Sequence, residues 1–316
     1  MNSAWVCKAV CTVLFALELC AQTPHEADSA LLHSSSGPMH VGFRCTDEDL
    51  QWAGLTCSDD EPCPIYLELS HIAAFGQKIF ATGNIHSASN TLYSIFLASD
   101  DNGLSWREAV PRIRGGEFDH IQFFDFETGW VSGQMLQPLP GDAFLLLTTD
   151  GGKTWRRRPV LDEDSPGSLV AFWFDTRKTG ALVMDRGQSS GNRYQLYEST
   201  SGGENWMIRQ MSSDPIKLRS APPIEDGGGW RIRADSGTKS FRIEKREGEG
   251  WKSVASFLLR LADCKPEPRT EAPPPPTTSS DAATGGEPDA KAGVENIPEF
   301  RIGGPPASPP RKRKPK

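Results

Sequence analysis

A tryptophan-centred cluster that recurs four times constrains the fold of this chain more than any other feature of its sequence. The four tryptophans follow one another at intervals of 49, 51 and 45 residues, and each has a glycine three positions before it. The pairs are Gly103 and Trp106, Gly152 and Trp155, Gly203 and Trp206, and Gly248 and Trp251. A period of about 20 to 50 residues is typical of architectures that stack one structural unit on the next. We therefore expect four related units.

The pattern inside a unit indicates β-structure. In the second unit, short apolar runs such as Ile121–Phe124 and Ala143–Thr148 are separated by Gly, Asn, Asp and Pro, which favour turns. No segment shows an apolar period of 3.6 residues over the length of a helix. A unit of roughly 45 to 50 residues that holds four short strands has the size of a propeller blade.

These observations predict an all-β fold, a β-propeller of about four to five four-stranded blades in residues 41–264. Residues 41–67 add a closing strand to the last blade or form a degenerate fifth blade. The expected repeat units cover residues 68–110, 117–160, 167–211 and 217–258.

The two ends of the chain differ from this body. Thirteen of the 25 prolines lie in residues 265–316, where almost no apolar side chains occur, so we expect a disordered Pro-rich tail. Its basic end is either solvated or contacts an anionic surface. The basic residues are Arg311, Lys312, Arg313, Lys314 and Lys316. The net charge of −7 argues against a nucleic-acid-binding protein, which needs a basic face.

The N-terminus has the pattern of a signal peptide. Lys8 precedes the apolar run Ala9–Leu17, which is too short to span a bilayer, and cleavage after Ala21 would make residues 1–21 the leader. A buried N-terminal helix is the alternative, and a lipoprotein site at Cys20 is less favoured because Leu19 is bulky. We expect residues 22–40 to form a linker and the mature protein to be periplasmic or secreted, with a bacterial source.

Removal of the leader leaves four cysteines, an even number that favours disulfides in an oxidising compartment. Cys57 and Cys63 enclose a short polar loop that a local disulfide would close, and Cys45 and Cys264 would then link the two ends of the body. Three connectivities are open in principle. Metal binding is the alternative, but the spacing is not that of a zinc site. We predict no metal site and no cofactor.

The first two clusters fit the pattern S/T-x-D-x-G-x-T/S-W, which resembles the Asp-box (BNR) repeat. In such a turn an aspartate accepts hydrogen bonds from backbone amides, a glycine adopts a left-handed conformation and the tryptophan packs beneath the loop. The third cluster has Ser201 and Asn205 in place of the aspartate and the threonine. The residues assigned to these structural turns are Ser99, Asp101, Gly103, Ser105, Trp106, Thr148, Asp150, Gly152, Thr154, Trp155, Ser199, Gly203, Trp206, Gly248 and Trp251.

The segment from Phe124 to Gly133, followed by Leu147–Trp155, resembles a blade of the photosystem II assembly factor (Hcf136-like) propeller family. The resemblance implies an exported β-propeller, and many members of that broad superfamily have no known reaction. Sialidases share only the Asp boxes, which lie away from their active sites. Pro111–Arg114 does not match the arginine motif of a sialidase, and the tyrosines lack the expected context. We therefore assign no catalytic residues.

The sequence thus predicts an exported, non-catalytic propeller that acts as a protein-interaction or assembly scaffold. Its contacts would be made by loops on one face, because binding residues concentrate on loops that a rigid scaffold positions. Candidate loops are His86–Asn90, Gln134–Asp142 and Arg186–Arg193. The partner would be a protein or a glycan. The alternative function is a carbohydrate-binding or sialidase-like glycoside hydrolase propeller.

Overall fold

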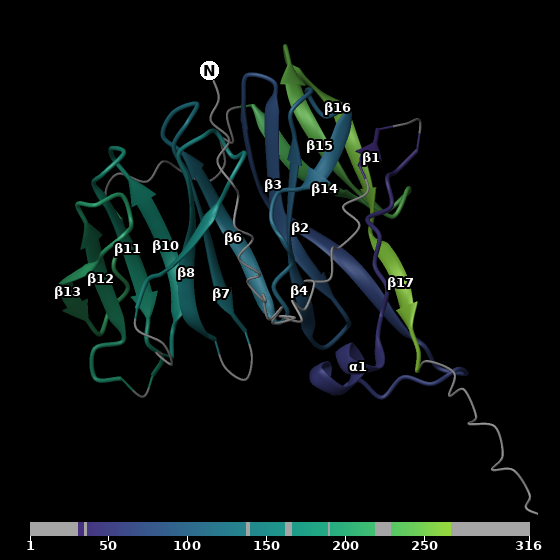
Figure 1. Cartoon of the computed structure of the whole chain (residues 1–316), viewed down its shortest axis with the longest axis horizontal. Coiled ribbons are helices and arrows are strands. Elements are labelled where there is room, and N and C mark those ends of the chain that lie inside the picture. Colours follow the sequence, from purple (N-terminus) through teal and green to yellow (C-terminus); the bar gives the residue numbers. More distant parts are fainter. Residues whose placement is uncertain are drawn as a thin grey trace, which may run out of the picture. The chain divides into compact units, whose positions relative to one another are not determined.

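The computed structural model describes residues 31–34, 37–136, 140–161, 166–188, 190–218 and 229–266. In these residues the chain forms seventeen strands and one short helix, so the predicted all-β class is confirmed. The strands make four antiparallel sheets and are labelled in Figure 1. The leader, the tail with its basic end and the region around Cys20 lie outside the described residues. No helix among the described residues is long and apolar enough to cross a membrane.

Each sheet falls on one of the four repeats. Sheet 2 contains β6 (Gly116–Phe123), β7 (Gly129–Met135), β8 (Gly141–Thr148) and β9 (Arg156–Pro159). Sheet 3 contains β10 (Ser168–Phe174), β11 (Gly180–Asp185), β12 (Tyr194–Ser199) and β13 (Met207–Ser212). Sheet 4 has three described strands, β14 (Trp230–Asp235), β15 (Ser240–Glu247) and β16 (Gly250–Leu258). In all three, strands adjacent in the sequence are adjacent in the sheet.

Sheet 1 is larger than the predicted blade. Its own strands are β2 (Cys63–Phe75), β3 (Lys78–His86), β4 (Thr91–Ser99) and β5 (Ser105–Glu108). Distant segments extend it at both edges, because β17 (Arg260–Cys264) pairs with β2, and β1 (Leu32–His33) pairs with β5. The strand order is β1-β5-β4-β3-β2-β17.

Two segments differ from the sequence prediction. Within the expected linker, β1 pairs with β5, and Met39 bridges to Phe257 of β16 in parallel and is 6% exposed. Residues 41–67 contain the helix α1 (Asp47–Ala53) and the first residues of β2, which pair with β17 in sheet 1 and do not add a strand to sheet 4 among the described residues. Thr46 caps this helix in a capping box with Asp49. With seven residues, α1 is too short for a 3.6-residue period to be visible in the sequence.

Three buried apolar clusters join the sheets in series. The largest joins sheet 4, sheet 1 and α1, another joins sheets 1 and 2, and the third joins sheets 2 and 3. Among the described residues, no cluster joins sheet 3 with sheet 4. Four sheets stacked in this order fit a propeller, whereas the number of blades and the closure of the ring remain predictions.

The boundary between sheets 2 and 3 shows how adjacent sheets are locked. Trp130 of β7 stacks on Phe174 of β10 with ring centroids 3.8 Å apart and planes inclined by 2°. The side-chain amide of Gln122 bonds both backbone groups of Phe174, since it donates to the carbonyl at 2.8 Å and accepts from the N–H at 2.9 Å. The inter-sheet space is therefore packed, and the buried Gln122 amide is hydrogen-bonded across it.

Both expected disulfides form. Cys57–Cys63 closes a local loop over a sequence separation of 6 residues. Cys45–Cys264 joins residues separated by 219 positions and ties the segment before α1 to the end of β17. The prediction of two structural disulfides is thereby confirmed.

Candidate functional site

Three polar turns join the third and fourth strands of sheets 1, 2 and 3, and all are held by equivalent hydrogen bonds. In the second turn, Thr148 Oγ1 accepts from the Gly152 N–H at 2.9 Å, and Asp150 Oδ1 accepts from the Thr154 N–H at 3.0 Å. In the first turn, Ser99 Oγ accepts from the Gly103 N–H, and Asp101 Oδ1 accepts from the Ser105 N–H. In the third turn, Ser199 Oγ accepts from the Gly203 N–H, and Ser201 Oγ accepts from the Asn205 N–H.

The carboxylates of these turns serve structure. Burial would raise the pKa of Asp150, but hydrogen bonds from the Thr154 side chain and amide, the Thr148 side chain and the Lys153 amide lower it to about 2. The pKa of Asp101 is lowered in the same way. Because several local hydrogen bonds favour the charged form, both carboxylates stay ionised at neutral pH.

The tryptophans of the clusters differ in burial. Trp106 is fully buried, and its indole N–H donates to the Gly103 carbonyl at 3.1 Å. Trp155 and Trp206 are partly buried beside the clusters that join the sheets. Trp251 does not pack beneath a turn, because it is 38% exposed and lies 4.1 Å under the guanidinium of Arg231.

The fourth cluster has a different turn. Glu247 pairs with Gly250, so Gly248 lies in a two-residue hairpin with a φ of 61°. Such a tight hairpin leaves no loop for Trp251 to pack beneath, which explains its exposure.

The three candidate loops join the second and third strands of sheets 1, 2 and 3, so they are equivalent connections. The loop His86–Asn90 is held against the helix, because the Asn90 amide donates to the Ala53 carbonyl at 2.7 Å. Part of Gln134–Asp142 lies outside the described residues. In Arg186–Arg193, the final arginine pairs with Asp185 at 2.7 Å, and Gln188 is exposed.

The outermost strands of the four sheets are protected to different degrees. The strand β5 is covered by β1, β16 is flanked by Met39, and β9 consists of three arginines and a proline. Charged residues and proline are common devices that block pairing at a sheet edge. The strand β13 has one charged residue, Arg209, which pairs with Glu198 of the neighbouring strand, and its apolar side chains Met207, Ile208 and Met211 are 55%, 50% and 53% exposed. Sheet 3 therefore presents an apolar edge.

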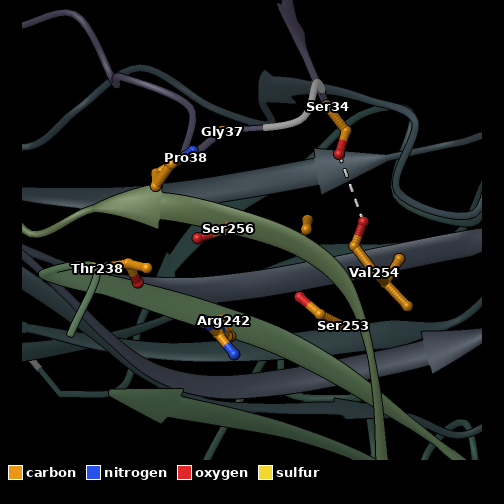
Figure 2. Close-up of a pocket in the computed structure, with 9 residues that line it drawn as sticks. Ser34, Gly37, Pro38, Thr238, Arg242, Ser253, Val254 and Ser256 are labelled. Atoms are coloured by element: carbon orange, nitrogen blue, oxygen red, sulfur yellow. Dashed lines mark hydrogen bonds between the residues drawn. The ribbon is translucent and has the colours of Figure 1, made fainter. Parts of the chain in front are cut away.

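A shallow cavity of about 350 Å³ lies between the 34–38 segment and strands β15 and β16 (Figure 2). Ser34 donates across it to the Val254 carbonyl at 3.4 Å. Its one cation among the described lining residues is Arg242, which forms an ion pair with Asp235. The lining has hydroxyls but no base beside them, so it does not form a nucleophile–base pair.

One arginine and one tyrosine among the groups considered for a sialidase-like reaction contact the helix α1 instead. Arg114 pairs with Glu48 at 2.6 Å and with the buried Asp49 at 3.3 Å. Burial and the hydrogen bond to Asp49 raise the pKa of Tyr93, which disfavours a phenolate nucleophile. These groups fasten α1 to sheet 1.

A cluster of two histidines and one aspartate lies between sheets 1 and 2. His71 belongs to β2, whereas Asp119 and His120 belong to β6. The two Asp119 oxygens lie 3.1 Å from His71 Nδ1 and 2.9 Å from His120 Nδ1, and the imidazole centroids are 4.2 Å apart. Burial would raise the pKa of Asp119, but the two histidines hold it well below its ordinary value.

Strand irregularities create this cluster. Consecutive residues of a regular strand point to opposite faces, yet the adjacent side chains of Asp119 and His120 hydrogen-bond each other. The register of β6 shifts between Phe118 and Ile121, and that of β2 shifts between Leu69 and His71. Bulges of this kind re-aim side chains and are frequent next to functional sites.

The repeat contained a signal for this cluster that the sequence analysis missed. His71 and His120 are 49 residues apart, the same interval that separates the first two cluster tryptophans. They occupy equivalent positions in the first strands of sheets 1 and 2. At the equivalent position 51 residues later, sheet 3 has Ala171.

The resemblance to the photosystem II assembly factor family is confirmed by two curated relatives. The chain is 29% identical over 110 residues to the photosystem II assembly lipoprotein Ycf48 of Synechococcus sp. (strain CC9902). The matched region covers 34% of this chain and 28% of that protein. It is 29% identical over 115 residues to the chloroplastic photosystem II stability/assembly factor HCF136 of Arabidopsis thaliana, 35% of this chain and 25% of that protein. The chain thus spans about a quarter of the length of these relatives. No known family profile matches it.

Among solved structures, the chain is similar to Ycf48 of Cyanidioschyzon merolae, with 18% identity and a TM-score of 0.29 over 61% of this chain and 56% of that chain. It is also similar to a GH74 xyloglucanase of Xanthomonas campestris, with 16% identity and a TM-score of 0.33 over 58% of this chain and 25% of that chain. Neither score is high enough for an argument about function.

Proposed function

We propose that this chain is an exported, non-catalytic scaffold that binds a protein partner through sheet 3. The observation that carries the proposal is the apolar edge strand β13, which has three large exposed apolar side chains. Exposed apolar surface of this kind marks protein interaction sites. The similarity to two proteins named as assembly factors supports a role in the assembly of a protein complex, with a photosystem as the precedent.

The mode of binding follows from the strand itself. An extended, apolar segment of the partner would add a strand beside β13, with backbone hydrogen bonds for affinity and the methionine side chains for contact area. The exposed Gln188 in the loop Arg186–Arg193 of the same sheet would extend the surface. This proposal moves the main contact from the loops to the strand edge.

Export is supported by the cysteines. The four cysteines outside the expected leader form two disulfides, which persist in oxidising compartments. The periplasm or the extracellular space is therefore the proposed location.

Site-specific photo-crosslinking tests the proposal. A benzoylphenylalanine is placed at Ile208 in β13, at Gln188 in the loop, or at Lys153 in the polar turn of sheet 2 as a matched exposed control. We expect the first two positions to capture the same protein from the exported fraction, and Met207→Lys to abolish the capture at Ile208. Equal capture from Lys153, or capture that survives Met207→Lys, would refute the assignment to sheet 3.

A further inference from the structure

We propose that His71, Asp119 and His120 form a binding site for a divalent first-row transition-metal ion between sheets 1 and 2. The inference does not depend on the proposed function, because it concerns a different part of the molecule. One ligand atom from each of the three side chains lies within 4.8 Å of the others.

The chemistry of the donors selects the metal class. Two imidazole nitrogens and one carboxylate suit Zn²⁺ and its first-row neighbours, whereas Mg²⁺ and Ca²⁺ prefer oxygen ligands alone. Three protein ligands leave at least one coordination position for water or another group. The side chains of His71, Asp119 and His120 are 24%, 37% and 27% exposed, so solvent reaches the cluster.

The three side chains are close enough to share one ion. In a tetrahedral site with metal–ligand bonds of 2.0 to 2.1 Å, the ligand atoms lie about 3.3 Å from one another. His71 Nδ1 lies 3.1 Å from Asp119 Oδ1, and His120 Nδ1 lies 2.9 Å from Asp119 Oδ2. Because the two distances involve different oxygens, Asp119 would bind the ion through both oxygens or rotate to present one of them.

His71 supplies an independent indication. Its Nδ1 atom is buried and faces the Asp119 carboxylate at 3.1 Å, in a geometry that is not that of a hydrogen bond. Buried polar atoms are normally hydrogen-bonded, so this nitrogen is held by the charge of Asp119 rather than by a well-formed hydrogen bond. Coordination of Nδ1 to a metal would give it a directed partner.

The backbone around the cluster is held in place by second contacts. Thr82 Oγ1 donates to the Asp119 carbonyl at 2.6 Å, and Ser132 Oγ accepts from the His120 N–H at 3.0 Å. Such outer contacts orient metal ligands and raise the affinity of a site. Because Thr82 lies in sheet 1 and Ser132 in sheet 2, both sheets position the ligands.

The first test is equilibrium binding of Zn²⁺ to the full chain after EDTA treatment and dialysis, measured by competition with a chromophoric chelator. We expect one saturable site whose affinity falls at least about hundredfold in His71→Gln and in His120→Gln, more than the loss of an outer contact costs. His33→Gln alters an exposed histidine of β1 and should leave the affinity unchanged. Absence of a saturable site, or equal affinity in all three variants, would overturn the proposal.

A second measurement uses Co²⁺ as a spectroscopic probe of the ligands. Co²⁺ bound to nitrogen and oxygen ligands in a site of low coordination number gives intense d–d absorption, and Zn²⁺ should displace it stoichiometrically. The difference spectrum between the wild-type protein and folded His120→Gln, verified by near-ultraviolet circular dichroism, should contain these bands without a thiolate charge-transfer band. A spectrum of hydrated Co²⁺ alone, or a difference spectrum dominated by thiolate, would show that no such site exists.

Discussion

Removal of the long-range disulfide should destabilise the protein much more than removal of the local one. In the chain-entropy description, a disulfide stabilises by restricting the unfolded chain, and its effect grows with the logarithm of the loop that it closes. The loop of Cys45–Cys264 spans 219 positions and that of Cys57–Cys63 spans 6. These separations correspond to about 5 and about 2 kcal/mol. The expected difference is therefore about 3 kcal/mol.

The assay is urea unfolding followed by tryptophan fluorescence, with three proteins in a background in which the other cysteines are alanine. The wild-type pairing is compared with Cys45→Ala/Cys264→Ala and with Cys57→Ala/Cys63→Ala. Loss of the long-range link should lower the unfolding midpoint by about 1 M urea or more relative to loss of the local one. The m-value should also rise, because the unfolded chain becomes more expanded.

The m-value separates the unfolded-state effect from a packing effect. Cys264 is fully buried, so its replacement also removes native contacts, but a native cavity does not increase the surface exposed on unfolding. Equal stability losses in the two double variants, or an unchanged m-value after removal of Cys45–Cys264, would refute the reasoning.

Three further predictions concern the turns. Hydrogen bonds lower the pKa of Asp150 in the folded state, so its ionised form stabilises fully above about pH 4, and this effect is lost as the pH falls through about 2. Asp150→Asn should therefore cost about 1 kcal/mol at pH 7 and only a fraction of that at pH 2 in urea titrations. In Gly152→Ala the new Cβ would lie 2.5 Å from the Phe80 ring at a φ of 80°, and thermal unfolding should show a loss above about 2 kcal/mol. The matched control, Gly248→Ala, meets nothing within 4 Å and should cost only about 1 kcal/mol, so equal losses would contradict the clash. Ser201→Asp restores a charged acceptor in the third turn and should raise the unfolding free energy by about 1 kcal/mol; a decrease would show that the charge is not accommodated.

The all-β class and the position of the sheets could be predicted because they depend on local patterns. Each polar turn is held by hydrogen bonds between residues at most four positions apart, so its residues recur at fixed spacing. The strands on either side are short apolar runs bounded by turn residues. The exposure of Trp251 could not be predicted from the spacing, because it depends on the two-residue length of one hairpin.

The additions to sheet 1 and the histidine cluster were not predicted, since they depend on contacts between distant residues. The pairing of β17 with β2 joins segments almost 200 positions apart, and nothing within either segment encodes it. Likewise, Asp119 and His120 point together only because β6 contains a bulge, which a strict two-residue alternation does not reveal. The equal spacing of the histidines and the tryptophans was the one available signal.

The pairing of β17 with β2 also sets the order of events during synthesis. Most strands of sheet 1 are made early, but β17 follows all the other strands of the described residues, so sheet 1 stays unfinished until translation has passed Cys264. Sheets 2 and 3 contain only consecutive strands and carry no such delay. A nascent chain halted before residue 260 would expose an unpaired edge of β2. The edge strand of sheet 1 is therefore closed by a segment from the opposite end of the folded body.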